Sequence, residues 1–390
     1  MQKYQKQLLI LLPILNLICG VTIDLYAPSL PQIEQFYRIS QSLAQNTITI
    51  TILGFALGQL IFGLLSDHYG RRSTIILALI VYLVATCEII FCKSVSLLLV
   101  GRALQGFACG SFAVNSRALA VDNFSGHDLK IAIVYLSLAW GIGPIVAPYI
   151  GGVLVTYLTW QSTFYVLLIY ALLLLWFTHT IIKSSNNKQL GFKAYFLAIK
   201  IMLLDREFLF RTIILGLCYV QGIIFNLTAP FWVTNLFHQE PAVFGQSALF
   251  LGVGYFCGTL LNRGLIKRLK ERSLIGFGLS LGVLCSFLFV SIDTFATIYE
   301  AAAFIAVINF GAGFIFSNVM AGNLAKYAKF AGICTALQGS LMLIIGATIS
   351  ILVSAMKNPS IHQISYIFLG LTILQLIMYY GYLIRKERLK

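Results

Sequence analysis

The sequence has 390 residues, of which 59% are hydrophobic and only 10% are charged. A soluble domain carries about 25% charged residues, so this composition excludes a soluble globular protein with a normal water-facing surface. The formal net charge of +14 could suggest nucleic-acid binding. The basic residues, however, concentrate in alternate loops between apolar segments, which is the pattern of a membrane topology.

Apolar segments of about 20 residues, long enough to cross a bilayer, recur along the whole chain. They predict an all-α integral membrane protein with twelve transmembrane helices, arranged as two pseudo-symmetric six-helix bundles. The predicted helices span residues 8–30, 43–65, 73–92, 95–120, 130–156, 161–182, 208–235, 243–266, 273–292, 295–321, 332–355 and 362–384.

The distribution of Lys and Arg predicts that both termini are cytoplasmic. The tails and loops on that side hold 22 of the 27 basic residues, and such an excess is typical of cytoplasmic loops. We therefore expect a multi-pass protein of the inner (plasma) membrane that contacts membrane lipid and binds no nucleic acid. The first hydrophobic stretch is too long for a signal peptide and lacks a cleavage site of small residues, so we expect it to be retained.

The stretch DLYAPSLP, residues 24–31, ends the first predicted helix and places a carboxylate beside apolar residues. An ionisable residue inside a membrane is costly and indicates a functional site. We predict that Asp24 binds a proton. The alternative is a helix-end carboxylate near a proline bend that reaches the water outside.

The turn between the second and third helices reads GLLSDHYGRRS and contains Gly63, Asp67, Gly70 and Arg71. The glycines permit a close helix approach and a tight turn. The pattern G-x-x-x-D-x-x-G-R-R resembles the signature of the major facilitator superfamily. The resemblance implies a conformational latch, in which Asp67 and Arg71 join the two halves on the cytoplasmic side in the outward-facing state. A solvated positive loop is the alternative.

The fourth helix contains GRALQG, which resembles the RxxQG motif of the same superfamily through Arg102 and Gln105. An arginine inside the bilayer costs about 2.5–3.5 kcal/mol, so its side chain should face the bundle interior. Arg102 and Asp24 have similar predicted depths. We predict that Arg102 tunes the proton site, either directly or through Gln105 or water.

The fifth helix carries GIGPIVAPYIGG, with Gly143, Pro144, Gly151 and Gly152. Glycines allow tight helix contacts and prolines bend helices. The stretch resembles the glycine and proline motif of antiporter branches, which implies a part in conformational switching. A kink that serves packing alone is the alternative.

Two pairs of matching stretches indicate an internal repeat. GQLIFGLLSDHYGRRS begins at Gly58 and GTLLNRGLIKRLKERS begins at Gly258, while DLYAP at Asp24 matches NLTAP at Asn226. Such repeats are typical of alternating-access transporters, whose binding site lies between the halves near the bilayer midplane. Because the amide of Asn226 does not titrate, only the first half has a group at this position, the Asp24 carboxylate, that can bind a proton.

The repeat divides the chain at its long polar or amphipathic interruption. We predict an N-terminal six-helix bundle over residues 1–182, a cytoplasmic linker over 183–206 and a C-terminal six-helix bundle over 207–390.

Several polar residues inside the predicted helices can line the cavity between the bundles, although each can equally form an interhelical hydrogen bond. These candidates are Asn16, Arg117, Gln221, Asn226, Asn309 and Asn318.

The sequence contains no signature of an enzyme, a metal site or a cofactor. Its eight cysteines are scattered singly, without a CxxC or Cys/His cluster, and no nucleotide-binding P-loop is present. We therefore expect no metal and no cofactor, and an ion gradient as the source of energy.

Together these motifs resemble the Bcr/CflA-type drug-efflux (drug:H⁺ antiporter) branch, densely over residues 20–165 and thinly beyond. One departure is Val121, which stands where members usually carry a second arginine before the aspartate of the fourth helix. We predict a monomeric, proton-coupled secondary transporter that exports small organic molecules by alternating access. The alternatives are a dedicated metabolite or siderophore exporter, a proton-coupled nutrient importer, and a non-transporting receptor or assembly partner.

Overall fold

The computed structural model describes the chain except for residues 1, 184–191, 293, 328–329, 357 and 389–390. Within the described residues, twelve helices are long and apolar enough to cross a membrane. The predicted number of spans is therefore confirmed. Helices suit these segments because a backbone inside a bilayer must satisfy its own hydrogen bonds.

The helical elements are α1 (Lys3–Asp24), η1 (Ala27–Ser29), α2 (Leu30–Tyr37), α3 (Gln41–Tyr69), α4 (Arg71–Phe91), α5 (Val95–Asn123), α6 (Gly126–Tyr157), α7 (Gln161–Ile181), α8 (Phe192–Leu204), α9 (Arg206–Phe231), η2 (Trp232–Leu236), α10 (Pro241–Leu265), α11 (Glu271–Val290), α12 (Ile298–Lys326), α13 (Ala331–Ser354) and α14 (Ile361–Arg388).

The first span is interrupted, where the sequence predicted a helix over 8–30 with a proline bend near its end. Helix α1 ends at Asp24, and the chain passes through the short 3₁₀ segment η1 before α2 continues to Tyr37. Pro28 and Pro31 lack the backbone N–H that a continuous helix needs. The break therefore leaves Asp24 as the last residue of a helix in the middle of a membrane span.

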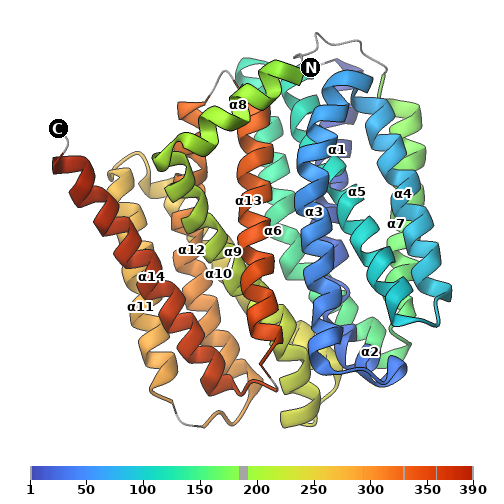
Figure 1. Cartoon of the computed structure of the whole chain (residues 1–390), viewed down its shortest axis with the longest axis vertical. Helices are drawn as coiled ribbons and strands as arrows, with labels where there is room; N and C mark the ends of the chain where they lie inside the picture. The colour runs from blue at the N-terminus through green and yellow to red at the C-terminus, as the bar shows by residue number, and fades with distance from the viewer. Residues whose placement is uncertain (1, 184–191, 293, 328–329, 357, 389–390) are drawn as a thin grey trace.

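The helices form two groups (Figure 1). Helices α1 to α5 and α7 lie on one side and α9 to α14 on the other, while α6 lies near the middle of the view. Two helix pairs join the groups, because α3 packs against α13 and α6 packs against α10. The start of α1 and the end of α14 lie at the same end of the molecule, which we call the termini end.

Helix α8 lies in the predicted linker and crosses the termini end (Figure 1). Residues 184–191 of that linker lie outside the described residues. The Tyr195 hydroxyl of α8 donates a hydrogen bond to the Leu60 carbonyl of α3 at 3.1 Å. Burial, together with the nearby Asp67 charge, raises the pKa of Tyr195 to about 12. The hydroxyl therefore remains a donor, and α8 ties the linker to α3.

An ionic cluster joins α9, α11 and α12 at the termini end. Arg211 pairs with Glu207 at 3.4 Å and with Glu271 at 3.1 Å. Lys326 pairs with Asp205 at 2.7 Å and with Glu207 at 3.1 Å. No local motif marks this cluster in the sequence, because its members come from three helices distant in the chain and from Asp205, the residue before α9.

Asp205 gives the cluster a pH dependence. Burial opposes its charge, but hydrogen bonds from Lys326, Tyr327 and the Glu207 backbone N–H together hold the pKa of Asp205 below its usual value. A lowered pKa in the folded state stabilises the protein above the unfolded value of about 3.9, and this contribution is lost as the pH falls through the folded-state pKa.

We predict that Asp205→Asn lowers the melting temperature of the purified protein at neutral pH. Asparagine is also a good N-cap residue, so the change removes the charge and keeps the cap that Asp205 forms on the Glu207 N–H at 3.0 Å. The melting curves of variant and wild type should converge once the pH falls below the folded-state pKa of Asp205. A constant difference at every pH, or an equal effect of Asp128→Asn on α6, would contradict this interpretation.

Candidate functional site

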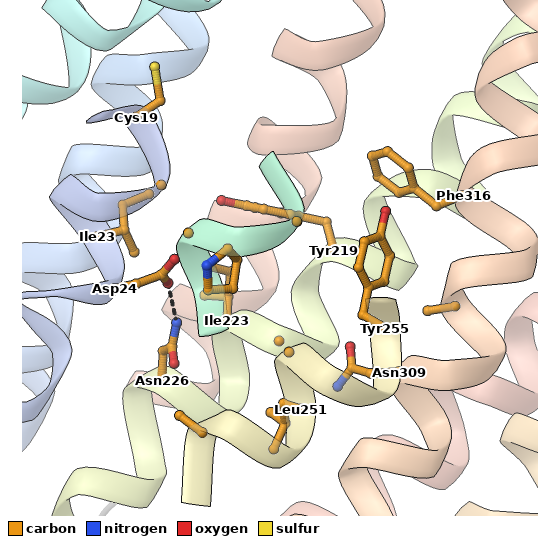
Figure 2. A pocket seen from close by; sticks show the side chains of 18 of the residues that line it. Cys19, Ile23, Asp24, Tyr219, Ile223, Asn226, Leu251, Tyr255, Asn309 and Phe316 are labelled. Carbon is orange, nitrogen blue, oxygen red and sulfur yellow. Dashed lines mark hydrogen bonds between the residues drawn. The ribbon is translucent and has the colours of Figure 1, made fainter. Parts of the chain in front are cut away.

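A central cavity of about 150 Å³ lies between the two groups of helices (Figure 2). Side chains of α1, α3 and α6 line it from one side, and side chains of α9, α10 and α12 line it from the other. Of the residues singled out in the sequence, the lining includes Asp24, Gly143, Pro144, Asn226 and Asn309.

Asp24 lies in this cavity and not in the water outside. Its side chain is at the end of α1, and the residue is only 6% exposed. The carboxylate Oδ1 accepts a hydrogen bond from Asn226 Nδ2 of α9 at 2.8 Å, as Figure 2 shows. This bond crosses the interface between the two groups of helices. A helix-end carboxylate that reaches outside water, the alternative raised above, does not fit this burial.

Asp24 and Asn226 are also the matching residues of the internal repeat. A pseudo-two-fold axis relates the halves of repeat transporters, and equivalent residues near such an axis face each other. Each half thus contributes the same position to one hydrogen bond, as a carboxylate from the first half and as an amide from the second. Among the residues that the structure describes, Asp24 forms no ion pair.

The opposite wall of the cavity is aromatic and amide-bearing. Tyr219, Tyr255 and Phe316 project into it near Asn309, and the Tyr219 ring extends toward the side where Asp24 lies (Figure 2). The Asn309 amide nitrogen donates to the Ile305 carbonyl of its own helix at 3.0 Å. The sequence showed abundant aromatics but gave no signal for which of them face inward, because aromatic residues also fill lipid-facing positions.

Arg102 holds the end of α1 and does not bind Asp24 directly. It is fully buried, and its guanidinium donates to the Thr22 carbonyl at 3.1 Å and to Gln105 Oε1 at 2.9 Å. Its Cζ also lies 4.3 Å from the centre of the Tyr26 ring. The last carbonyls of a helix lack partners within that helix, so the break after Asp24 supplies an acceptor for this arginine. The direct contact with Asp24 considered above is therefore replaced by a contact with the backbone two residues earlier.

The residues of the predicted latch bond within one group of helices. Arg71 pairs with Asp67 at 2.6 Å and with Asp122 of α5 at 3.1 Å. Gly70, at φ +85°, allows the sharp turn from α3 to α4. In this structure Asp67 and Arg71 therefore do not join the two halves, and their role as a latch in the outward-facing state stays a prediction. Asp122, which the sequence analysis did not select, is a member of this network.

Gly63 instead makes the contact with the other half. A Cβ there would lie 3.1 Å from the Tyr195 hydroxyl and 3.8 Å from the Ala336 side chain of α13. Two turns earlier on α3, the Ala56 carbonyl accepts from the Ser340 hydroxyl of α13 at 2.8 Å. The termini end of α3 is thus packed against α8 and α13.

The paired glycines of α6 serve two different neighbours. A side chain at Gly151 would overlap the Leu25 carbonyl oxygen, which directly follows Asp24. A side chain at Gly152 would crowd the Pro241 carbonyl of α10, 2.8 Å away, on the other half. Helix α6 therefore passes between the end of α1 and the start of α10, and it touches both because two successive positions lack side chains.

Four of the cavity candidates lie outside its lining, and for three of them an interhelical hydrogen bond gives the reason. Asn16 bonds to the Leu136 carbonyl at 3.5 Å, Gln221 to Gln375 at 3.3 Å and Asn318 to Asn262 at 2.8 Å. Arg117 is half-buried on α5 and does not line the cavity either.

No metal centre is evident in the described ranges, where no group of three or more His, Cys, Asp or Glu side chains could hold an ion.

Comparisons with known proteins agree with this architecture. Residues 14–350 match the family model described as Major Facilitator Superfamily. An uncharacterized transporter of Rickettsia bellii is 27% identical over 93% of each chain. A bicyclomycin resistance protein homolog of Haemophilus influenzae is 25% identical and covers 97% of this chain and 96% of its own.

A crystal structure of a D-xylose-proton symporter has a TM-score of 0.73 against this chain at 14% identity, with 96% of this chain and 97% of the symporter covered. At this identity the likeness shows the fold alone. The relatives by sequence agree with the drug-efflux branch that the motifs resemble.

We predict that Gly151→Ala destabilises the contact between α6 and the end of α1. The added methyl group must displace the Leu25 carbonyl, and overpacking of this kind costs about 1–3 kcal/mol. The melting temperature of the detergent-purified protein should fall. Gly370→Ala on α14 is the matched control, because a Cβ there meets no neighbour within 4 Å. Equal melting temperatures for the two variants would show that α6 has room at Gly151.

Proposed function

This chain belongs to the Major Facilitator Superfamily, and we propose that it is a proton-coupled secondary transporter that exports small organic molecules by alternating access. The observation that carries the proposal is the buried Asp24 carboxylate in the central cavity, bonded to Asn226 of the other half. The family consists of membrane transporters, and one relative is named as a bicyclomycin resistance protein homolog.

Asp24 is the proposed proton carrier because no cation in the described part of the chain pairs with it. An unpaired charge inside a membrane is costly, and intramembrane carboxylates commonly act in proton relays. Uptake of a proton removes that charge. In our proposal Asp24 is loaded with a proton from one side of the membrane and unloaded toward the other.

The bond between Asp24 and Asn226 supplies a physical link between protonation and conformation. Hydrogen bonds to an ionised acceptor are roughly twice as strong as those between neutral groups. The charged carboxylate therefore holds α1 to α9 more firmly than the protonated one. Loading a proton on Asp24 would loosen this contact and favour separation of the halves on one side of the cavity.

The lining of the cavity supports a small organic molecule as the substrate. Tyr219, Tyr255 and Phe316 offer faces for aromatic or aliphatic groups, and Asn226 and Asn309 offer amides. Pockets for small molecules combine apolar walls with a few polar groups in this way. A cationic or polar part of the substrate can compete with the proton for Asp24, and such competition gives antiport.

We further propose that the termini end faces the cytoplasm, in line with the excess of basic residues there, and that one chain suffices for transport. Export then means uptake from the termini end and release at the opposite end. Arg102 would act by fixing the end of α1 through the Thr22 carbonyl, which sets the position and surroundings of Asp24.

We predict that Asp24→Asn abolishes transport driven by an imposed pH gradient in proteoliposomes. The asparagine keeps the size of the side chain and removes the proton, so the flux of a transported solute should fall at least tenfold, to the level of passive exchange. The measurement uses a panel of amphipathic organic solutes and a pH-sensitive dye inside the vesicles. Glu300→Gln is the matched control, since Glu300 lies exposed near the start of α12, where it accepts from the Ala296 N–H at 3.1 Å.

Undiminished, still pH-driven flux in Asp24→Asn would refute Asp24 as the proton site. Flux toward the termini end under the same gradient would favour an importer. A wild-type protein that moves none of the solutes and carries no proton current would favour a receptor.

We predict that Arg102→Gln shifts the pH dependence of this flux toward higher pH. Removing a nearby positive charge makes a charged carboxylate less favourable, so Asp24 should remain loaded with its proton at higher pH. A lower maximal flux with an unchanged pH profile would instead assign Arg102 a role in packing alone. Flux should be recorded over a series of equal internal and external pH values with a fixed solute gradient.

A further inference from the structure

Two surface cavities at the termini end occupy equivalent places in the two halves. One, of about 560 Å³, lies between the start of α1, the start of α4 and the end of α7 with the two residues that follow it. The other, of about 310 Å³, lies mainly between the start of α9, the start of α11 and the end of α14. These are the first, third and sixth spans of each half, and α4 with α7 and α11 with α14 lie on opposite flanks (Figure 1).

The internal repeat relates two parts of these cavities, at α4 and α11 and at the ends of α7 and α14. Arg72 and Arg272 are the second residues of α4 and α11, and they fall at the same place in the aligned repeat, 200 positions apart. At the same offset, His179, Ile182 and Lys183 in the lining of the first cavity correspond in position to Tyr379, Tyr382 and Leu383 in the lining of the second. The latch network uses Arg71, so Arg72 and Arg272 are left without a role in the transport proposal.

The first cavity is positively charged. Lys3, Arg72 and Lys183 line it, and its lining contains no Asp or Glu among the described residues. The guanidinium of Arg72 donates to the His179 carbonyl at 2.9 Å, while its Nε is buried without a partner. The Lys183 ammonium lies 4.9 Å from the centre of the Tyr4 ring, which holds it at the cavity wall. A buried donor without a partner indicates an acceptor group that belongs there.

The second cavity is also lined by basic residues and tyrosines, but its positive charge is smaller. Arg211, Arg272 and Glu271 line it beside Tyr379 and Tyr382. Glu271 pairs with Arg211 at 3.1 Å and offsets part of the positive charge. Tyr379 is only 6% exposed. Its buried ring forms part of the wall and brings its phenol group to the site.

The position of the first cavity points to the membrane surface. It lies where three spans end, and Trp176, one turn deeper on α7, is 61% exposed. Exposed tryptophans are enriched at the level of the lipid headgroups. Basic pockets between helices at this level bind anionic headgroups. A phosphate group would accept from arginine and lysine together, and a lipid would leave its acyl chains along the exposed apolar helix surface.

We propose that these cavities are two repeat-related binding sites for anionic phospholipid headgroups, with Arg72 and Arg272 as the respective phosphate-binding residues. The first site binds more tightly because three cations line it without an acidic neighbour. Occupied sites would fasten the first, third and sixth spans of each half to one membrane surface. This inference rests on the membrane fold and not on the proposed substrate or on proton coupling.

The test counts lipids bound to the purified full-length protein by native mass spectrometry, with dioctanoyl phosphatidylglycerol as the probe. Wild type should bind two molecules with unequal affinity. Arg72→Gln should weaken the tighter site and Arg272→Gln the weaker site, each by about fivefold, as expected when one cation is removed near an anionic lipid. The double variant should show this weakening at both sites. Arg268→Gln removes an exposed cation on the same face outside both cavities and should change nothing.

Further measurements distinguish a lipid headgroup from free phosphate, and loss of the arginine charge from misfolding of the variant. Arg72→Lys keeps a positive charge and should retain most of the binding. Dioctanoyl phosphatidylcholine should bind neither site with comparable affinity. Inorganic phosphate that competes as well as the lipid would assign the cavities to a free anion and overturn the lipid assignment. Unchanged binding in the double variant, or an equal loss in Arg268→Gln, would overturn the proposal as a whole.

Discussion

The hydrogen bond from Asn226 to Asp24 is the interaction on which the rest of this structure depends. It joins the two halves at the cavity, and it uses the repeat-equivalent residue from each. A bond between a charged carboxylate and an amide contributes about 1.5–3 kcal/mol, whereas the large apolar surfaces of the helices contribute regardless of pH. A proton can therefore change this contact without unfolding anything around it. At this pair of equivalent positions the two halves differ in chemistry, because only the first half carries a carboxylate.

The surroundings of Asp24 follow from the break in the first span. Because α1 ends at Asp24, the Thr22 carbonyl is free to accept from Arg102. The adjacent Leu25 carbonyl lies against Gly151 of α6, where no side chain fits. Gly152 then brings α6 to the start of α10 in the other half. The end of α1 is thus held by Arg102 of α5 and by α6. Because α6 also contacts the opposite half, a movement of one half against the other would shift the surroundings of the Asp24 carboxylate.

The two termini-end networks show how the halves differ. In the first half, Arg71 binds Asp67 and Asp122. Two of these residues, Asp67 and Arg71, belong to the sequence motif of the turn between α3 and α4. In the second half, Arg211 and Lys326 bind three acids drawn from helix ends and the residue before α9. Both halves therefore have an ionic network that joins their spans at this end, but different residues form it in each half. The second network has no local motif, which is why sequence reasoning overlooked it.

The sequence by itself determined the twelve spans and the matching stretches of the two halves, and it marked Asp24 as a candidate, because hydropathy, alignment of the halves and the cost of a buried charge can all be read along the chain. Only the tertiary structure decided which polar residues face the cavity. The sequence does not distinguish the amides that line the cavity, Asn226 and Asn309, from those that do not. The others, Asn16, Gln221 and Asn318, form hydrogen bonds to neighbouring helices. It also replaced a direct contact between Arg102 and Asp24 by one with the backbone, and it selected Tyr219, Tyr255 and Phe316 from many aromatics. The physical reason is that in a membrane helix all faces are apolar enough to meet lipid, so only packing between helices tells the inward face from the outward one.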